Sequence, residues 1–63
     1  MAEENLAILQ RAREHLVKQR LAIAKTLAEG YKRGDTERQM VAMVDVQHVI
    51  EVIDKAIADE RPR

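Results

Sequence analysis

The stretch from Gly30 to Thr36 constrains the fold most, because it holds both glycines of the chain and separates two long segments of helical periodicity. Glycine adopts the left-handed conformations that end helices. The segments on either side are rich in helix-forming residues, and their apolar positions recur every three or four residues. The pattern therefore predicts an all-α fold in which two helices form an antiparallel hairpin.

Either glycine is able to end the first helix, which is expected to cover about residues 3–33. Gly34 is preferred over Gly30, because Lys32 and Arg33 would then lie in the last turn, where cations interact favourably with the helix dipole. Keeping Gly30 inside the helix would cost roughly 1 kcal/mol relative to alanine. The choice between the two glycines stays open at this point.

The second helix is expected to begin near Glu37 and to cover about residues 37–60, after a turn at 34–36. Thr36 and Gln39 have the spacing of a capping box, in which each side chain bonds a backbone N–H of the other residue. Pro62 pushes the residue before it out of the helical conformation. Residues 61–63 are therefore expected to form a frayed tail.

With 63 residues, the chain is expected to form a single domain over 1–63, too small for a comfortably stable core of its own. Small chains compensate with disulfides, metals or oligomerisation. The chain has no cysteine, which removes disulfides and Cys-ligated zinc. Oligomerisation is therefore the leading expectation.

Two rows of apolar residues support this expectation. The first row, shared by both helices, is the predicted hairpin core: Leu9, Leu16, Ile23, Leu27, Met43, Val46, Ile50, Ile53 and Ile57. The second row follows the first helix and is the predicted dimer or partner interface: Val17, Leu21, Ala24, Ala28 and Tyr31. Soluble monomers rarely expose such a strip.

The second row has two interpretations. A homodimer in which two hairpins pack as a four-helix bundle, with coiled-coil-like seams, is preferred. The alternative is that the strip docks another helical protein, with the hairpin as an adaptor. Parallel and antiparallel arrangements of the two hairpins are equally compatible with the sequence.

Antiparallel folding about the turn pairs positions whose numbers sum to about 67, which places Arg13 opposite Asp54 and Arg20 opposite Gln47. Both arginines fall within the apolar face of the first helix. One hypothesis is that Arg13 and Asp54 form a polar pair that fixes the register. The other is that each arginine lays its aliphatic stem on the apolar surface and extends its guanidinium to water.

No group of residues in the sequence forms a convincing catalytic or metal site. His48 lies three residues from Asp45 and from Glu51, a spacing found in di-metal helix bundles, but it falls on the face opposite the isoleucines. His15 has no nucleophile or fixed acid beside it. The sequence therefore predicts a non-enzymatic protein with no catalytic, metal or cofactor-binding residues.

A line of cations follows the first helix, since Arg11, Lys18, Lys25 and Lys32 recur every seven residues. This basic stripe suggests an alternative function as a nucleic-acid-associated accessory protein. The preferred explanation is the ordinary solvent-exposed side of a bundle helix, on which opposite charges four residues apart pair. Eleven basic and eleven acidic residues cancel, which argues against a dedicated nucleic-acid binder.

The longest apolar run, Met40–Val44, is far shorter than the roughly 20 residues that a spanning helix requires. No membrane partner is expected, and the acidic N-terminal residues do not resemble a secretory signal, which predicts a cytoplasmic location. The function predicted from sequence is a small homodimeric interaction or assembly module.

Overall fold

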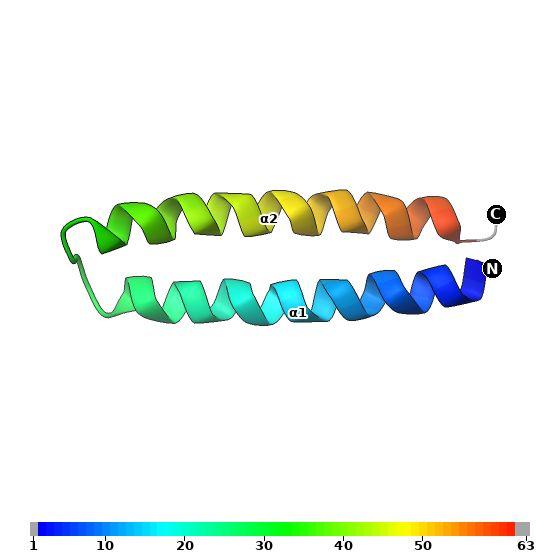
Figure 1. Cartoon of the computed structure of the whole chain (residues 1–63), viewed down its shortest axis with the longest axis horizontal. Coiled ribbons are helices and arrows are strands. Elements are labelled where there is room, and N and C mark those ends of the chain that lie inside the picture. The colour runs from blue at the N-terminus through cyan, green and yellow to red at the C-terminus, as the bar shows by residue number, and fades with distance from the viewer. Residues whose placement is uncertain (1, 62–63) are drawn as a thin grey trace.

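The computed structural model describes residues 2–61, which form two α-helices, α1 (Ala2–Ala28) and α2 (Asp35–Glu60). The helices lie side by side and run in opposite directions, with the connection at one end of the molecule (Figure 1). The Cα atoms span 47 × 14 × 14 Å, so the molecule is a rod with a single layer of two helices. The predicted all-helical hairpin is confirmed.

The end of α1 differs from the prediction, because the helix stops at Ala28 and not near residue 33. Gly30 follows with φ 108°, in the left-handed region that a Cβ atom disfavours. Its N–H donates to the carbonyl of Leu27 at 3.2 Å, which closes the last turn. The preference for Gly34 as the end of the first helix was therefore wrong, and Gly30 takes that role.

Bonds within the connection explain why α1 stops early. The N–H of Lys32 donates to the hydroxyl of Thr36 at 2.8 Å, and the N–H of Thr36 donates to the carbonyl of Lys32 at 2.9 Å. A helix continued through Gly30 would break this pair of bonds and would keep a glycine in its interior at a cost of about 1 kcal/mol. The local bonds therefore outweigh the extra helical turn.

The start of α2 also departs from the prediction, since Thr36 lies inside the first turn and Gly34 is the N-cap residue, with φ 82°. The predicted capping box of Thr36 and Gln39 is therefore wrong. The carboxylate of Glu37 accepts from the N–H of Gly34 at 2.8 Å, which is the glutamate half of a box. Glycine has no side chain to supply the other half.

The other end of α2 matches the sequence prediction, since the helix ends at Glu60. Arg61 has an extended backbone, with φ −72° and ψ 138°, and its N–H still donates to the carbonyl of Ile57 at 3.2 Å. Residues 62 and 63 of the predicted tail lie outside the described residues.

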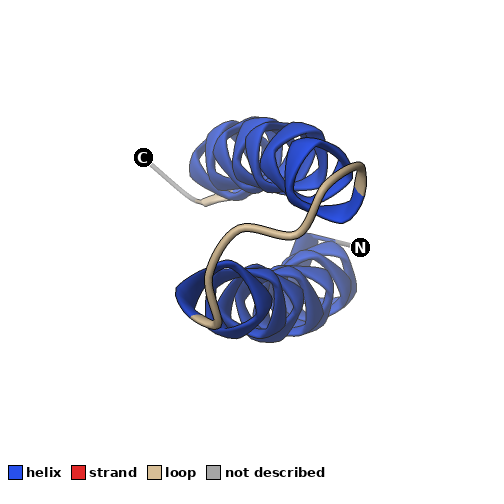
Figure 2. Ribbon diagram, turned by 90° about the vertical axis from the view of Figure 1, so that its left-hand side faces the viewer, coloured by secondary structure: helices blue, strands red, loops and turns tan. Residues whose placement is uncertain are grey.

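Each helix has one neighbour, as the view along the hairpin shows (Figure 2). Among the described residues, only Ile50 and Ile57 are buried, with 2% and 7% of their surface exposed. The other predicted core residues are partly buried: Leu9, Leu16, Ile23, Leu27, Met43, Val46 and Ile53. The predicted core therefore lies between the helices, but one hairpin covers it incompletely.

Replacing Gly30 by alanine is expected to destabilise the hairpin by about 1–2 kcal/mol, because a side chain disfavours its left-handed conformation. A Cβ atom at this position would meet nothing within 4 Å, so the cost is conformational and not steric. Urea unfolding followed by circular dichroism, at one fixed protein concentration, measures the change.

Arg33→Ala is the control, because Arg33 is an exposed residue of the same connection. If Gly30→Ala is no less stable than Arg33→Ala, the left-handed turn does not set the end of α1.

Candidate interaction surface

Two polar pairs join the helices along one side of the hairpin. The ε nitrogen of Arg13 lies 2.5 Å from a carboxylate oxygen of Asp54. Two helical turns further along α1, Arg20 donates to the side-chain oxygen of Gln47 at 2.7 Å. The residue numbers of both pairs sum to 67, which is the register expected from the sequence.

The Arg13–Asp54 pair combines features of both sequence-based hypotheses. The two side chains are bonded, and the hydrogen bond from Arg13 to Asp54, with the charge of Asp54, raises the pKa of the guanidinium. Yet the side chains are 42% and 46% exposed, so the pair is not buried. Ion pairs this exposed are screened by water and contribute little. Its role in fixing the register stays a prediction.

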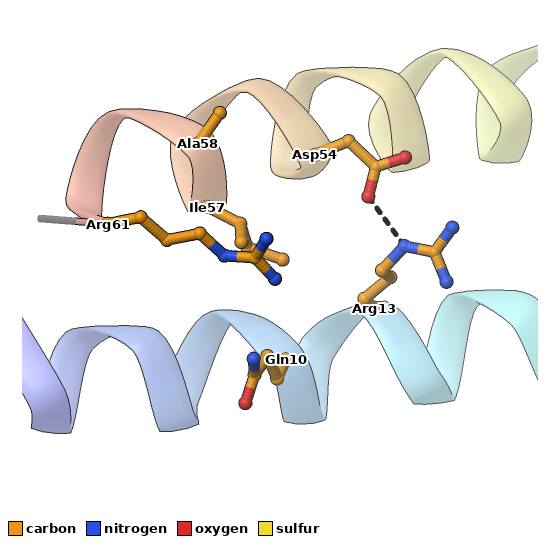
Figure 3. A pocket seen from close by; sticks show the side chains of 6 residues that line it. All are labelled: Gln10, Arg13, Asp54, Ile57, Ala58 and Arg61. Atoms are coloured by element: carbon orange, nitrogen blue, oxygen red, sulfur yellow. Dashed lines mark hydrogen bonds and ion pairs between the residues drawn. The ribbon is translucent and has the colours of Figure 1, made fainter. Parts of the chain in front are cut away.

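The Arg13–Asp54 pair lines an open hollow of about 360 Å³ near the end of the hairpin that is opposite the connection. Figure 3 shows the arginine reaching from α1 towards Asp54 of α2, with Arg61 extending over Ile57 beside it. The remaining lining residues are Gln10 and Ala58. Within this hollow the guanidinium of Arg13 is already bonded to the carboxylate of Asp54, so its charge is partly neutralised.

The predicted interface row on α1 is shorter and less exposed than expected. Leu21 is 56% exposed, whereas Val17 and Ala24 are partly buried. Ala28 is the last residue of α1, and Tyr31 lies beyond it in the connection. The prediction that Tyr31 continues the helical row was therefore wrong.

Tyr31 instead contacts the start of α2. Its hydroxyl donates to the carboxylate of Glu37 at 2.6 Å. This bond is the largest cause that lowers the pKa of Glu37, and the backbone N–H groups of Glu37 and Gly34 act in the same direction. The same bond raises the pKa of Tyr31. Tyr31 thus ties the connection to α2, although 70% of its surface is exposed.

Most of the exposed apolar surface lies on α2, which the sequence reasoning did not identify. The large apolar residues exposed on this helix are Met40, Val41, Val44, Val49 and Val52. On α1, only Ile8 and Leu21 belong to this class. A sequence signal was available, because residues 40–53 contain only two charged residues, Asp45 and Glu51. A helix that is apolar on several sides is usually covered on several sides.

Three of the four residues of the predicted basic stripe lie on α1. Arg11, Lys18 and Lys25 are exposed on α1, but Lys32 lies in the connection, where its ammonium group is 3.3 Å from the carboxylate of Glu29. The prediction of four cations in line on one helix was therefore wrong, because α1 ends before the fourth.

His48 is exposed on α2, as are Asp45 and Glu51. Gln47 donates to the carboxylate of Glu51 at 3.3 Å. Within residues 2–61, no three or more His, Cys, Asp or Glu side chains are grouped in a way that would hold a metal ion. Neither α1 nor α2, over their described residues, combines the length and apolar character that crossing a membrane requires.

Comparison with known proteins adds no relative, since no family model, curated protein or solved structure matches the chain.

Changing Arg13 and Asp54 to leucine, singly and together, tests the polar pair. Because both side chains are half exposed, the losses of thermal stability from the single changes are expected to add up nearly to that of the double variant. Any remaining coupling should shrink as salt is raised, because salt screens exposed charges. Single variants that are much less stable than the double variant would show that the pair behaves as buried and fixes the register.

Glu37→Gln is expected to lower the melting temperature at about pH 7 and to change it less at about pH 3. The folded state lowers the pKa of Glu37, so its ionised form stabilises the fold above the unfolded-state pKa of about 4.3. That stabilisation disappears as the pH falls through the lower folded-state pKa. Thermal unfolding followed by circular dichroism measures both differences.

Glu14→Gln, an exposed position in the middle of α1, is the matched control for this series. If the melting temperatures of wild type and Glu37→Gln differ by the same amount at both pH values, the ionised form of Glu37 is not the stabilising group.

Proposed function

We propose that this chain is a non-enzymatic protein–protein interaction or assembly module that acts as a homodimer, two hairpins forming a four-helix bundle. The observation that carries the proposal is the small core of the single hairpin, in which only Ile50 and Ile57 are buried among the described residues. A second hairpin would cover the residues that the first leaves partly exposed.

The surface area of the chain supports the same proposal. A compact monomer of 7.2 kDa exposes about 4,100 Å² on average, whereas this hairpin exposes 5,111 Å². The excess is about 1,000 Å². A stable protein–protein interface buries about 800 Å² on each partner. The hairpin therefore has surplus surface for one interface of ordinary size.

The distribution of charge gives the module its solvent-exposed side. Arg11, Lys18 and Lys25 lie seven residues apart on α1 and are exposed, so this side of the helix is poorly suited to an apolar contact. On α2, by contrast, several valines are exposed. An interface is therefore more favourable on a surface that includes α2 than on the outer side of α1.

Sedimentation equilibrium of the wild-type chain, from low micromolar concentration upwards, tests the proposed function. The expected molar mass is about twice 7.2 kDa, with helical content that falls on dilution as dimers dissociate, because the isolated hairpin has too small a core to stay folded. A fully helical species of 7.2 kDa at every concentration would contradict the homodimer and would favour a different protein as partner.

A further inference from the structure

The two long sides of the hairpin differ in chemistry. One side carries the interhelical polar pairs Arg13–Asp54 and Arg20–Gln47, and its hollow is lined by Arg13, Asp54 and Arg61 among others (Figure 3). We call this the charged side. The opposite side has a hollow of about 290 Å³, lined by Asn5, Ile8, Leu9, Ala56 and Glu60.

On the opposite side, α2 presents a continuous apolar line, whereas α1 contributes apolar side chains near the open end and polar ones, at Gln19 and Thr26, further along. Ala42, Val49 and Ala56 recur every seven residues on α2, so at about 100° per residue they form one line along the helix. Around the axis of α2, that line lies roughly 100° from Ile50, which faces α1. Gln47 and Asp54 lie on the other side of Ile50. We call the surface the uncharged face; its members are Ile8 and Ala12 of α1 with Ala42, Val46, Val49, Ile53 and Ala56 of α2.

The exposure of these residues agrees with this assignment. Val46 and Ile53, between that line and the seam, are partly buried, whereas Val49 has 41% of its surface exposed. Ile8 contributes the matching exposed aliphatic side chain from α1. The uncharged face is thus continuous with the core around Ile50, and covering it would complete the burial of the core from one side.

We infer that a second copy of the chain packs on the uncharged face, and not on the α1 row of Val17, Leu21, Ala24 and Ala28. This inference rests on the proposed function and adds the surface through which the homodimer forms. The surplus of about 1,000 Å² is enough for one standard interface of about 800 Å² per partner, so one side is covered and the other stays in water.

Electrostatics selects which side is covered. Covering the charged side would remove water from Arg13, Asp54 and Arg20, and the desolvation of such groups offsets much of the gain from apolar burial. A two-fold dimer also places the same surface of each copy against the other. Between Arg38 and Glu60, which lie at its two ends, the α2 part of the uncharged face carries no charged side chain, so a contact there avoids like charges.

The test compares Val49→Glu with Leu21→Glu by sedimentation equilibrium. The two are matched, because both replace an apolar side chain that is about half exposed in the hairpin, on opposite sides. Val49→Glu is expected to raise the dimer dissociation constant at least about 100-fold, the effect of burying an unpaired carboxylate. Leu21→Glu should change it less than about threefold, as expected for a surface substitution.

The reverse ranking would overturn the inference and leave the homodimer intact, with the α1 row as its interface. A wild type that is monomeric would instead refute the proposed function itself. Val44→Glu, an exposed position on the charged side of α2, is a third variant. If Val44→Glu alone dissociates the dimer, the uncharged face is not the contact.

Thiol labelling gives a readout that does not depend on the glutamate variants folding. The chain has no cysteine, so Val49→Cys and Leu21→Cys each introduce a single thiol. In the dimer, the thiol at position 49 is expected to react at least about ten times more slowly than the thiol at position 21, because the second copy covers it. The hairpin alone leaves both positions about half exposed, so it does not predict such a difference. Equal rates at the two positions would overturn the inference.

Discussion

Two helices that pack only against each other bury only the strip of each that faces the other, and this limit governs the whole molecule. The contact between the helices buries Ile50 and Ile57, while the neighbouring residues along the same contact keep part of their surface in water. Apolar surface removed from water is the main favourable term in folding, at about 25 cal/mol per Å². A small hairpin without disulfides has few other sources of stability. The geometry of two helices thus leaves apolar surface exposed, and this surface is the basis for the proposed second copy.

Polar residues pair across the helices at the margin of the seam, where they cost little in desolvation. Arg13 and Arg20 extend their aliphatic stems across the contact, and their charged ends meet Asp54 and Gln47 where water still reaches them. Enclosing a charged group such as Arg13 or Asp54 carries a desolvation cost that offsets much of the attraction in an ion pair. Their position makes one side of the hairpin polar, and the opposite side is left without charges along most of its length. The two long sides of the hairpin therefore differ in charge, and this difference is the basis for the proposed contact surface.

The connection contributes to the same arrangement by fixing where each helix stops. Gly30 and Gly34 both adopt positive φ, and Thr36, Glu37 and Tyr31 supply the hydrogen bonds that hold the loop between them. The earlier end of α1 removes Tyr31 and Lys32 from that helix. The row of apolar residues and the row of cations on α1 are both shortened as a result. The remaining exposed apolar surface is concentrated on α2, between Met40 and Val52.

The sequence by itself determined the hairpin, its antiparallel register and the residues between the helices, because helical periodicity and two glycines leave few alternatives for 63 residues. The same arithmetic placed Arg13 opposite Asp54, and the structure shows that the two side chains are bonded. The tertiary structure alone decided which glycine ends α1, since that depends on bonds from Lys32 and Tyr31 to residues of α2 that local capping signals do not include. It also decided how much of each apolar row is covered, because exposure depends on the neighbouring helix as well as on spacing. Val49 and Leu21 belong to rows of similar spacing, and only the packed hairpin places one on the uncharged face and the other beside the arginines.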